Sequence, residues 1–160
     1  FLLIDKRYIE NQIHHSYSKK VVFIEDYAFL INALNDLYDN TLNFKYKDLA
    51  KKLAKEAIAK FYIKNKNIFQ KNLINNNDAF YNPVDIGDNT IPNGNAIMLI
   101  NFVRLGMMDD AKKLTDSLNG YLNIYKSHMM TALRAIDFFN NIKEGKNCNE
   151  QGCKIDVKKD

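Results

Sequence analysis

The sequence predicts an all-α fold made of helical hairpins, with at most a small β-hairpin. Two prolines and six glycines in 160 residues favour long helices over many tight turns. Five segments place apolar residues three and four positions apart, the spacing of one helix face. Helices that look buried alternate with amphipathic ones, as in the two concentric layers of an α/α toroid. A plain helical bundle would show the same stripes.

The composition is that of an ordinary folded domain. Apolar residues make up 46% of the chain and charged residues 26%, which excludes a wholly disordered chain. The net charge of +4 comes from lysines scattered among acids, so we expect no nucleic-acid partner. No apolar run reaches the roughly 18–20 residues that cross a bilayer, so we expect no membrane association.

The chain begins at Phe1 without a methionine and shows no signal peptide. We therefore expect a cytoplasmic location and interpret the chain as a fragment of a longer protein. Part of a helical ring exposes apolar surface that the other hairpins would cover. Self-association of the fragment is an expected consequence.

The first helix is predicted over residues 24–39, with Glu25 and Asp26 in its first turn, where the helix dipole favours acids. The second is predicted over residues 45–65, with one apolar face and a lysine-rich face that we expect to be solvated. Residues 1–20 show no sustained period and are expected to form loop or short strand.

Residues 66–91 break the helical pattern. Residues 68–69 and 79–81 are predicted as short strands around a polar turn at 75–78, followed by a loop. Pro92 suits the first turn of a third helix over residues 92–105. This helix is almost apolar all round from residue 96, so we expect it to be the most buried. Gly106 is expected to end it.

Two more helices are predicted over residues 109–125 and 128–142. The first of them begins with two aspartates and has one apolar stripe, and the second is mostly apolar. Short links between several helices favour antiparallel neighbours. We expect one domain over residues 1–145, part of an α/α toroid, and a charged tail with a cysteine pair over residues 146–160.

The predicted inner helices begin with polar residues. In a helical ring, alternate helices point the same way, so these starts should share one end. Helix N-termini offer free N–H groups and positive dipole ends, which suit a sugar-like or anionic ligand. As the alternative, such residues at helix starts are commonly caps. The expected ligand-binding residues are Glu25, Tyr27, Asp85, Asn93 and Asn95.

Catalysis would require acid–base groups at the same end, and the candidates are Asp26, Asp88 and His128. A sugar epimerase needs a base on each face of the sugar carbon, and the histidines available are His14, His15 and His128. A glycosidase needs two carboxylates that flank the bond. No triad motif, Gly-rich phosphate loop or HExxH motif is present. Enzyme activity is left open.

Cys148 and Cys153 are the two cysteines of the chain. A C-x₄-C pair can remain as thiols, close a small disulfide loop or supply two metal ligands. A structural zinc site usually needs four N or S ligands, and no neighbouring Cys or His completes one. Disulfides are uncommon in a reducing cytoplasm, so reduced thiols are expected first. No cofactor is predicted.

Short motifs in order along the chain resemble one protein family. They are Glu25-Asp26-Tyr27-Ala28-Phe29-Leu30-Ile31, Leu37-Tyr38-Asp39, Asp88 before Pro92-Asn93-Gly94-Asn95-Ala96, and the Cys148 to Cys153 spacing. Together they resemble the C-terminal region of the thioredoxin-domain-containing proteins related to spermatogenesis-associated protein 20. The resemblance runs from about residue 14 to residue 153. Asn93 and Ala96 stand where the family has serines, which puts hydroxyl-dependent roles there in doubt.

The resemblance implies a fold more firmly than a function. Members of the family carry an N-terminal thioredoxin-like domain and then an α/α toroid similar to that of six-hairpin glycosidases and N-acylglucosamine 2-epimerases. This chain would be roughly the last half of the toroid in a bacterial protein, with the thioredoxin-like domain as its partner. Three functions follow as expectations: a helical part that binds a sugar-like ligand, a carbohydrate-acting hydrolase or epimerase, and a scaffold for the thioredoxin-like domain.

Overall fold

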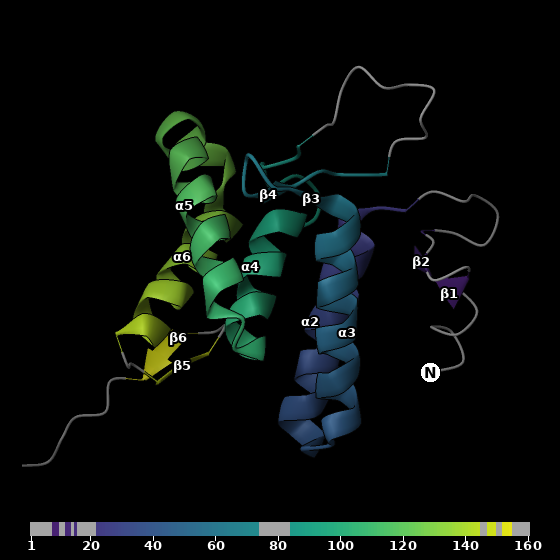
Figure 1. Cartoon of the computed structure of the whole chain (residues 1–160). Helices are drawn as coiled ribbons and strands as arrows, with labels where there is room; N and C mark the ends of the chain where they lie inside the picture. Colours follow the sequence, from purple (N-terminus) through teal and green to yellow (C-terminus); the bar gives the residue numbers. More distant parts are fainter. Residues whose placement is uncertain are drawn as a thin grey trace, which may run out of the picture. The chain divides into compact units, whose positions relative to one another are not determined.

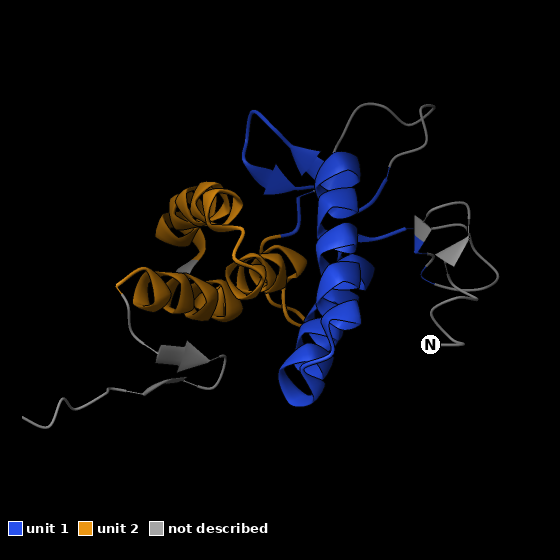
Figure 2. Cartoon of the chain, turned by 60° about the horizontal axis from the view of Figure 1, so that its bottom comes forward, with its two compact units in different colours: residues 1–85 blue, residues 86–160 orange. Residues whose placement is uncertain are grey.

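A computed structural model of the chain describes residues 8–9, 12–13, 15, 22–73, 84–144, 147–149 and 152–154. Within these ranges the chain forms five α-helices, one 3-10 turn and three two-stranded antiparallel sheets (Figure 1). Each strand has only two or three residues, so the prediction of an all-α fold is confirmed. The chain divides into two compact units, unit 1 (residues 1–85) and unit 2 (residues 86–160) (Figure 2).

Unit 1 is built on a helical hairpin. Helix α2 (Ile24–Thr41) and helix α3 (Phe44–Phe61) lie side by side (Figure 1). Between them, Leu42 turns the chain with a positive φ of 54°, and the side chain of Asn43 caps α3 by accepting the N–H of Lys45 at 3.1 Å. Each helix buries one apolar face, as the predicted stripes require. The buried residues of these faces include Tyr27, Ala28, Ile31, Leu34, Ala50, Leu53, Ala54, Ala57 and Phe61.

Two short sheets accompany the hairpin. Strand β1 (Tyr8–Ile9) pairs with β2 (Gln12–Ile13), and β3 (Tyr62–Ile63) pairs with β4 (Ile68–Phe69). Helix α3 therefore ends at residue 61 and not at residue 65 as predicted, because Tyr62 is extended and pairs with Phe69. Residues 68–69 form a strand as predicted, but their partner precedes them. Residues 75–81, predicted as the turn and second strand, lie outside the described residues.

The segment after β4 runs antiparallel beside the start of α2. The N–H of Ile24 donates to the carbonyl of Lys71 at 2.9 Å, and Phe23 forms a β-bridge with Asn72. Phe23 occupies the N-cap position of α2 and makes no side-chain cap bond. The carbonyl of Lys71 thus satisfies a helix N–H that would otherwise lack an acceptor. The same pairing brings Lys71 to the first turn of α2.

Unit 2 is a cluster of three helices that pack against one another: α4 (Gly94–Leu105), α5 (Met108–Tyr125) and α6 (Met130–Lys143). The 3-10 turn η1 (Lys126–His128) precedes α6. Strands β5 (Asn147–Asn149) and β6 (Gly152–Lys154) form a hairpin next to α6. Eleven of the twelve residues of α4 are buried, a larger share than in any other described helix. The prediction that this helix is the most buried is confirmed.

Two helix starts in unit 2 differ from the prediction. Helix α4 begins at Gly94, and the side-chain oxygen of Asn93 caps it by accepting the N–H of Ala96 at 3.2 Å. Pro92 therefore precedes the cap and does not lie in the first turn. Helix α6 begins at Met130, so His128 belongs to the 3-10 turn and not to the helix. Gly106, with a φ of 73°, ends α4 as predicted.

The burial of α4 leads to a stability prediction. Leu99 in α4 is fully buried, whereas Leu133 in α6 is 49% exposed. Truncation of Leu99 to Ala leaves a cavity, so we expect the free energy of unfolding to fall by ~2–5 kcal/mol. Leu133→Ala, the matched control, should cost less than about 1 kcal/mol. Urea unfolding followed by circular dichroism measures both, and equal costs would contradict a core position for Leu99.

Candidate functional site

Three consecutive residues in the first turn of α2 make contacts in three directions. Glu25 lies near the segment that follows β4, Asp26 contacts His15, and Tyr27 contacts α3. Successive residues in a helix are rotated by about 100°, so their side chains leave the helix on different sides. The expected site residues of unit 1 therefore do not share one set of contacts.

Glu25 carries a buried carboxyl oxygen that lacks a partner. Its Oε2 atom is inaccessible to solvent and has no hydrogen bond among the described residues. Burial raises the pKa of Glu25 above its ordinary value of 4.5; its own backbone N–H and the charge of Lys71 offset part of the rise, and Asp85 and Asp26 add to it. Glu25 can thus keep a proton at pH values where an exposed glutamate has lost it, and it can offer that proton to a bound molecule.

Lys71 and Asp85 form an ion pair whose charges act on Glu25. Lys71 Nζ lies 2.8 Å from Asp85 Oδ2, and the two side chains are 41% and 26% exposed. The hydrogen bond to Asp85 raises the pKa of Lys71, burial lowers it, and the negative charges of Asp85 and Glu25 add to the rise. The lysine therefore stays charged. Together these three groups, called the Glu25 cluster below, offer a cationic donor, an anionic acceptor and a carboxyl group that can be protonated.

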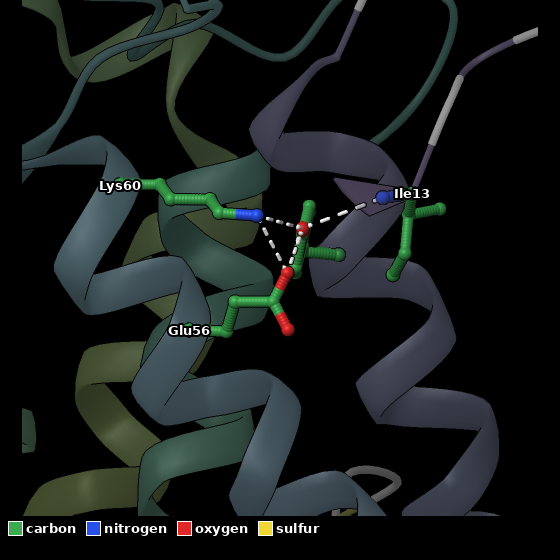
Figure 3. Close-up of polar contacts among 4 residues, drawn as sticks. Ile13, Glu56 and Lys60 are labelled. Atoms are coloured by element: carbon green, nitrogen blue, oxygen red, sulfur yellow. Dashed lines mark hydrogen bonds and ion pairs between the residues drawn. The ribbon is translucent and has the colours of Figure 1, made fainter. Parts of the chain in front are cut away.

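The hydroxyl of Tyr27 links α2 to α3 and β2. It donates to Glu56 Oε1 at 2.5 Å, and it accepts the backbone N–H of Ile13 and the Nζ of Lys60, each at 3.4 Å. Figure 3 shows Glu56 and Lys60 reaching from α3 toward this hydroxyl, where they also pair with each other at 2.8 Å. Because Tyr27 is fully buried, these bonds give it a structural role. Its expected ligand contact stays a prediction.

Asp26 is held by a histidine from the N-terminal segment. The Nδ1 atom of His15 lies 3.1 Å from Asp26 Oδ1 and 3.2 Å from Oδ2. The side chain of His15 is 61% exposed and that of Asp26 is 12% exposed. His15 also meets the ring of Phe23 edge-on, with 5.2 Å between centroids. The catalytic role expected of Asp26 stays a prediction. His14 lies outside the described residues.

Asp88 joins the starts of two helices in unit 2. Its Oδ1 accepts the N–H of Asn93 at 3.0 Å, and its Oδ2 accepts the N–H of Thr131 at 2.7 Å. Its own N–H donates to the carbonyl of His128 at 2.6 Å. Met129, at the N-cap position of α6, makes no side-chain cap bond, so Asp88 acts as the cap from a distant part of the sequence. Both carboxylate oxygens are engaged, which supports the capping interpretation for Asp88.

The other expected residues of unit 2 also lie at helix starts. Asn93 caps α4 and donates from its amide to the carbonyl of Gly87 at 3.5 Å. Asn95 is buried in the first turn of α4. His128 is exposed, and its Nδ1 lies 2.9 Å from the hydroxyl of Ser127. These contacts bring Asp88, Asn93 and His128 into one network. The expected clustering of Asp26 with Asp88, which lie in different units, stays a prediction.

Three polar residues of unit 1 were missed by the sequence analysis: Glu56, Lys60 and Lys71. Glu56 and Lys60 lie on the face of α3 that was expected to be solvated, yet their side chains are 14% and 22% exposed. An acid four residues before a lysine in a lysine-rich helix was the available signal. Lys71 follows a short strand, and no pattern in the sequence distinguishes it from the other lysines.

Two features of the described residues concern metal ions and membranes. No group of three or more His, Cys, Asp or Glu side chains able to hold a metal ion occurs within the described ranges. None of the described helices is long and apolar enough to span a membrane. No family model matches the sequence, and no curated protein matches it.

The capping role of Asp88 can be tested by substitution. Asp88→Asn keeps the size of the side chain but leaves one acceptor oxygen for two backbone N–H groups. We expect the free energy of unfolding to fall by ~0.5–2 kcal/mol. Asp116→Asn on the exposed face of α5 is the control and should change it by less than about 0.5 kcal/mol. Chemical denaturation compares the two, and an unchanged midpoint for Asp88→Asn would refute the capping role.

The hydroxyl of Tyr27 gives a second stability prediction. Tyr27→Phe removes the bonds to Glu56 and to the N–H of Ile13 while keeping the ring, which packs edge-on against Phe61. A hydrogen bond to a charged group contributes about 1.5–3 kcal/mol, so we expect a loss near that size. Tyr38→Phe, in the same helix, is the control, because the ring of Tyr38 contacts Phe44 and Lys47 and these contacts survive. Similar thermal midpoints for both variants would contradict the role assigned to Tyr27.

Burial of Glu25 should make stability depend on pH. Below pH 4.5 the carboxyl is protonated in both states; above it, the unfolded chain releases the proton first because the folded pKa is raised. The free energy of unfolding should therefore fall as pH rises from 4.5 to the folded pKa and then level off.

Glu25→Gln should remove the decrease in the free energy of unfolding that comes from Glu25. The variant should therefore be more stable than the wild-type chain at pH 7. Asp116→Asn, at an exposed position in α5, should follow the wild-type profile. Urea titrations from pH 4 to 8 measure all three proteins. A Glu25→Gln variant less stable than the wild type at pH 7 would show that the ionised carboxylate stabilises the fold.

Proposed function

We propose that unit 1 binds a polyhydroxylated, sugar-like molecule at the Glu25 cluster. The observation that carries this proposal is the buried Oε2 atom of Glu25, which has no hydrogen-bond partner among the described residues. A buried polar atom without a partner costs about 1–3 kcal/mol. A ligand that enters beside Lys71 and Asp85 and displaces the side chains covering Oε2 would donate a hydroxyl to it and recover part of that energy. Most buried polar atoms in native structures have a partner, so the exception at Glu25 calls for an explanation, and a bound ligand would provide one.

The neighbours of Glu25 support the same class of ligand. The Nζ of Lys71 can donate to a ring or hydroxyl oxygen, and the carboxylate of Asp85 can accept from a second hydroxyl. Both side chains are partly exposed, so a ligand can reach them from solvent. A sugar presents several donors and acceptors close together, which matches this mixture better than an apolar molecule does. Tyr27 would stabilise the site by holding α2 against α3.

We also propose that the chain is the C-terminal helical part of a bacterial, cytoplasmic protein of the thioredoxin-domain-containing family related to spermatogenesis-associated protein 20. The motif order along the sequence supports this membership, and the almost fully buried α4 beside the amphipathic α5 is compatible with the inner and outer layers of a toroid. The N-terminal thioredoxin-like domain would be its covalent partner. For unit 2, the engaged oxygens of Asp88 favour a scaffold role.

Large apolar side chains on the surface support self-association of this chain. Leu42 and Phe44 are 70% and 65% exposed in unit 1, and Ile124 and Met130 are 71% and 62% exposed in unit 2. Surfaces of this kind mark interfaces when they are contiguous. Sedimentation velocity should show a dimer or larger species at high concentration, and a clean monomer would contradict the proposal.

A carbohydrate-acting hydrolase is the second candidate, favoured by the raised pKa of Glu25 next to the carboxylate of Asp85. Glycoside hydrolysis uses one carboxylic acid that stays protonated and one ionised carboxylate. In this candidate Glu25 would be the acid and Asp85 the base or nucleophile. Turnover of aryl glycosides should fall ~10²–10⁴-fold in Glu25→Gln, and should decline in the wild type as pH rises through the pKa of Glu25.

The binding proposal is tested with a panel of neutral mono- and disaccharides and their phosphates. Isothermal titration calorimetry should detect binding of at least one neutral sugar to the wild-type chain. Glu25→Ala should weaken that binding about tenfold or more, because a hydrogen bond to a buried charged or acidic group is lost. Glu144→Ala is the control and should bind as the wild type does. Equal affinity of Glu25→Ala, or no binding of any sugar in the panel, would overturn the proposal.

A further inference from the structure

The β5–β6 hairpin places the two cysteines of the chain at the same register position. Cys148 in β5 pairs directly with Cys153 in β6, between the pairs Asn147–Lys154 and Asn149–Gly152. The two strands are joined by residues 150–151, and the hairpin lies next to α6. Residues directly opposite each other in an antiparallel pair occupy the same face of the sheet.

This register meets the backbone requirement of a disulfide. Cα atoms of directly opposed residues in antiparallel strands are about 4.5–5.5 Å apart. A disulfide needs Cα atoms about 4.4–6.8 Å apart. The two cysteines can therefore be joined with little movement of the backbone. In an unpaired segment, the backbone of a C-x₄-C pair would first have to adopt this geometry.

We propose that Cys148 and Cys153 form a thiol–disulfide exchange site that reacts with small disulfides such as oxidised glutathione. One cysteine thiolate attacks a sulfur of the small disulfide, so that a mixed disulfide forms and one thiolate leaves. The second cysteine thiolate then attacks the protein sulfur of that mixed disulfide and releases the second thiol. The protein loses two electrons and two protons, and the small disulfide gains both as it becomes two thiols.

The size of the loop favours a reversible bond over a structural one. Four residues separate the cysteines, so a disulfide would restrict the unfolded chain only slightly, and its stabilising effect grows with loop length. The site is separate from the Glu25 cluster and does not depend on the sugar-binding proposal.

The experiment uses the whole chain in glutathione buffers that span reducing to oxidising ratios. After equilibration, free thiols are blocked with N-ethylmaleimide and the intact mass is measured. The chain has two cysteines, so every mass change reports on this pair. As the buffer becomes more oxidising, we expect the doubly labelled form to be replaced by an unlabelled form. The mass of this form should be that of the reduced, unlabelled chain minus two hydrogens, with little glutathione adduct. Cys148→Ser and Cys153→Ser should each hold about tenfold more glutathione adduct than the wild type, because no second thiol resolves it.

A variant with the register displaced separates pairing from simple proximity. In Cys153→Ser combined with Lys154→Cys, the new cysteine is opposite Asn147 and not opposite Cys148. This variant should accumulate glutathione adducts as the single-serine variants do. The proposal is overturned if the displaced pair closes as readily as the native pair, if the wild type collects one glutathione on each cysteine, or if it stays doubly labelled in the most oxidising buffer.

Discussion

The pairing of residues 71–72 with the start of α2 is the constraint on which unit 1 depends. Phe23 occupies the N-cap position of α2 without making a side-chain cap bond, so the helix takes its acceptor from the carbonyl of Lys71. That bond brings the side chain of Lys71, and with it Asp85, to the first turn of α2. The same packing buries Glu25 and leaves its Oε2 atom without a partner among the described residues. A backbone hydrogen bond thus fixes the start of α2 and also brings together the charged groups of the Glu25 cluster.

In unit 2, a side chain and not a backbone carbonyl compensates for an apolar residue at an N-cap position. Met129 makes no cap bond for α6, and the carboxylate of Asp88 supplies the acceptor. Because Asp88 also accepts the N–H of Asn93, one side chain fixes the starts of both α4 and α6. The two apolar N-cap positions, Phe23 and Met129, are therefore both compensated by residues distant in sequence. In unit 1 the first turn of α2 holds a carboxyl oxygen without a partner among the described residues, whereas in unit 2 both oxygens of Asp88 are engaged.

Periodicity predicted the helices well, because each buries a face whose spacing is visible in the sequence. The C-terminal end of α4 was predicted at Gly106, whereas capping by Asn93 was only the alternative to ligand binding. Contacts between residues distant in the sequence could not be predicted. Nothing in the sequence pattern pairs Lys71 with the start of α2, and Glu56 was assigned to a solvated face because its neighbours are lysines. The raised pKa of Glu25 was not predicted, because its largest cause is burial. The toroid and the sugar-like ligand stay proposals.

Burial at the first turn of α2 raises the pKa of Glu25 above its ordinary value. A titration of the Glu25 side-chain carboxyl carbon by nuclear magnetic resonance in the folded chain measures this pKa. We expect a value above 4.5 and a further rise in Lys71→Met, because the positive charge of Lys71 opposes the effect of burial. A pKa at or below 4.5 in the wild-type chain, or a value that does not change in Lys71→Met, would show that burial does not control this carboxyl group.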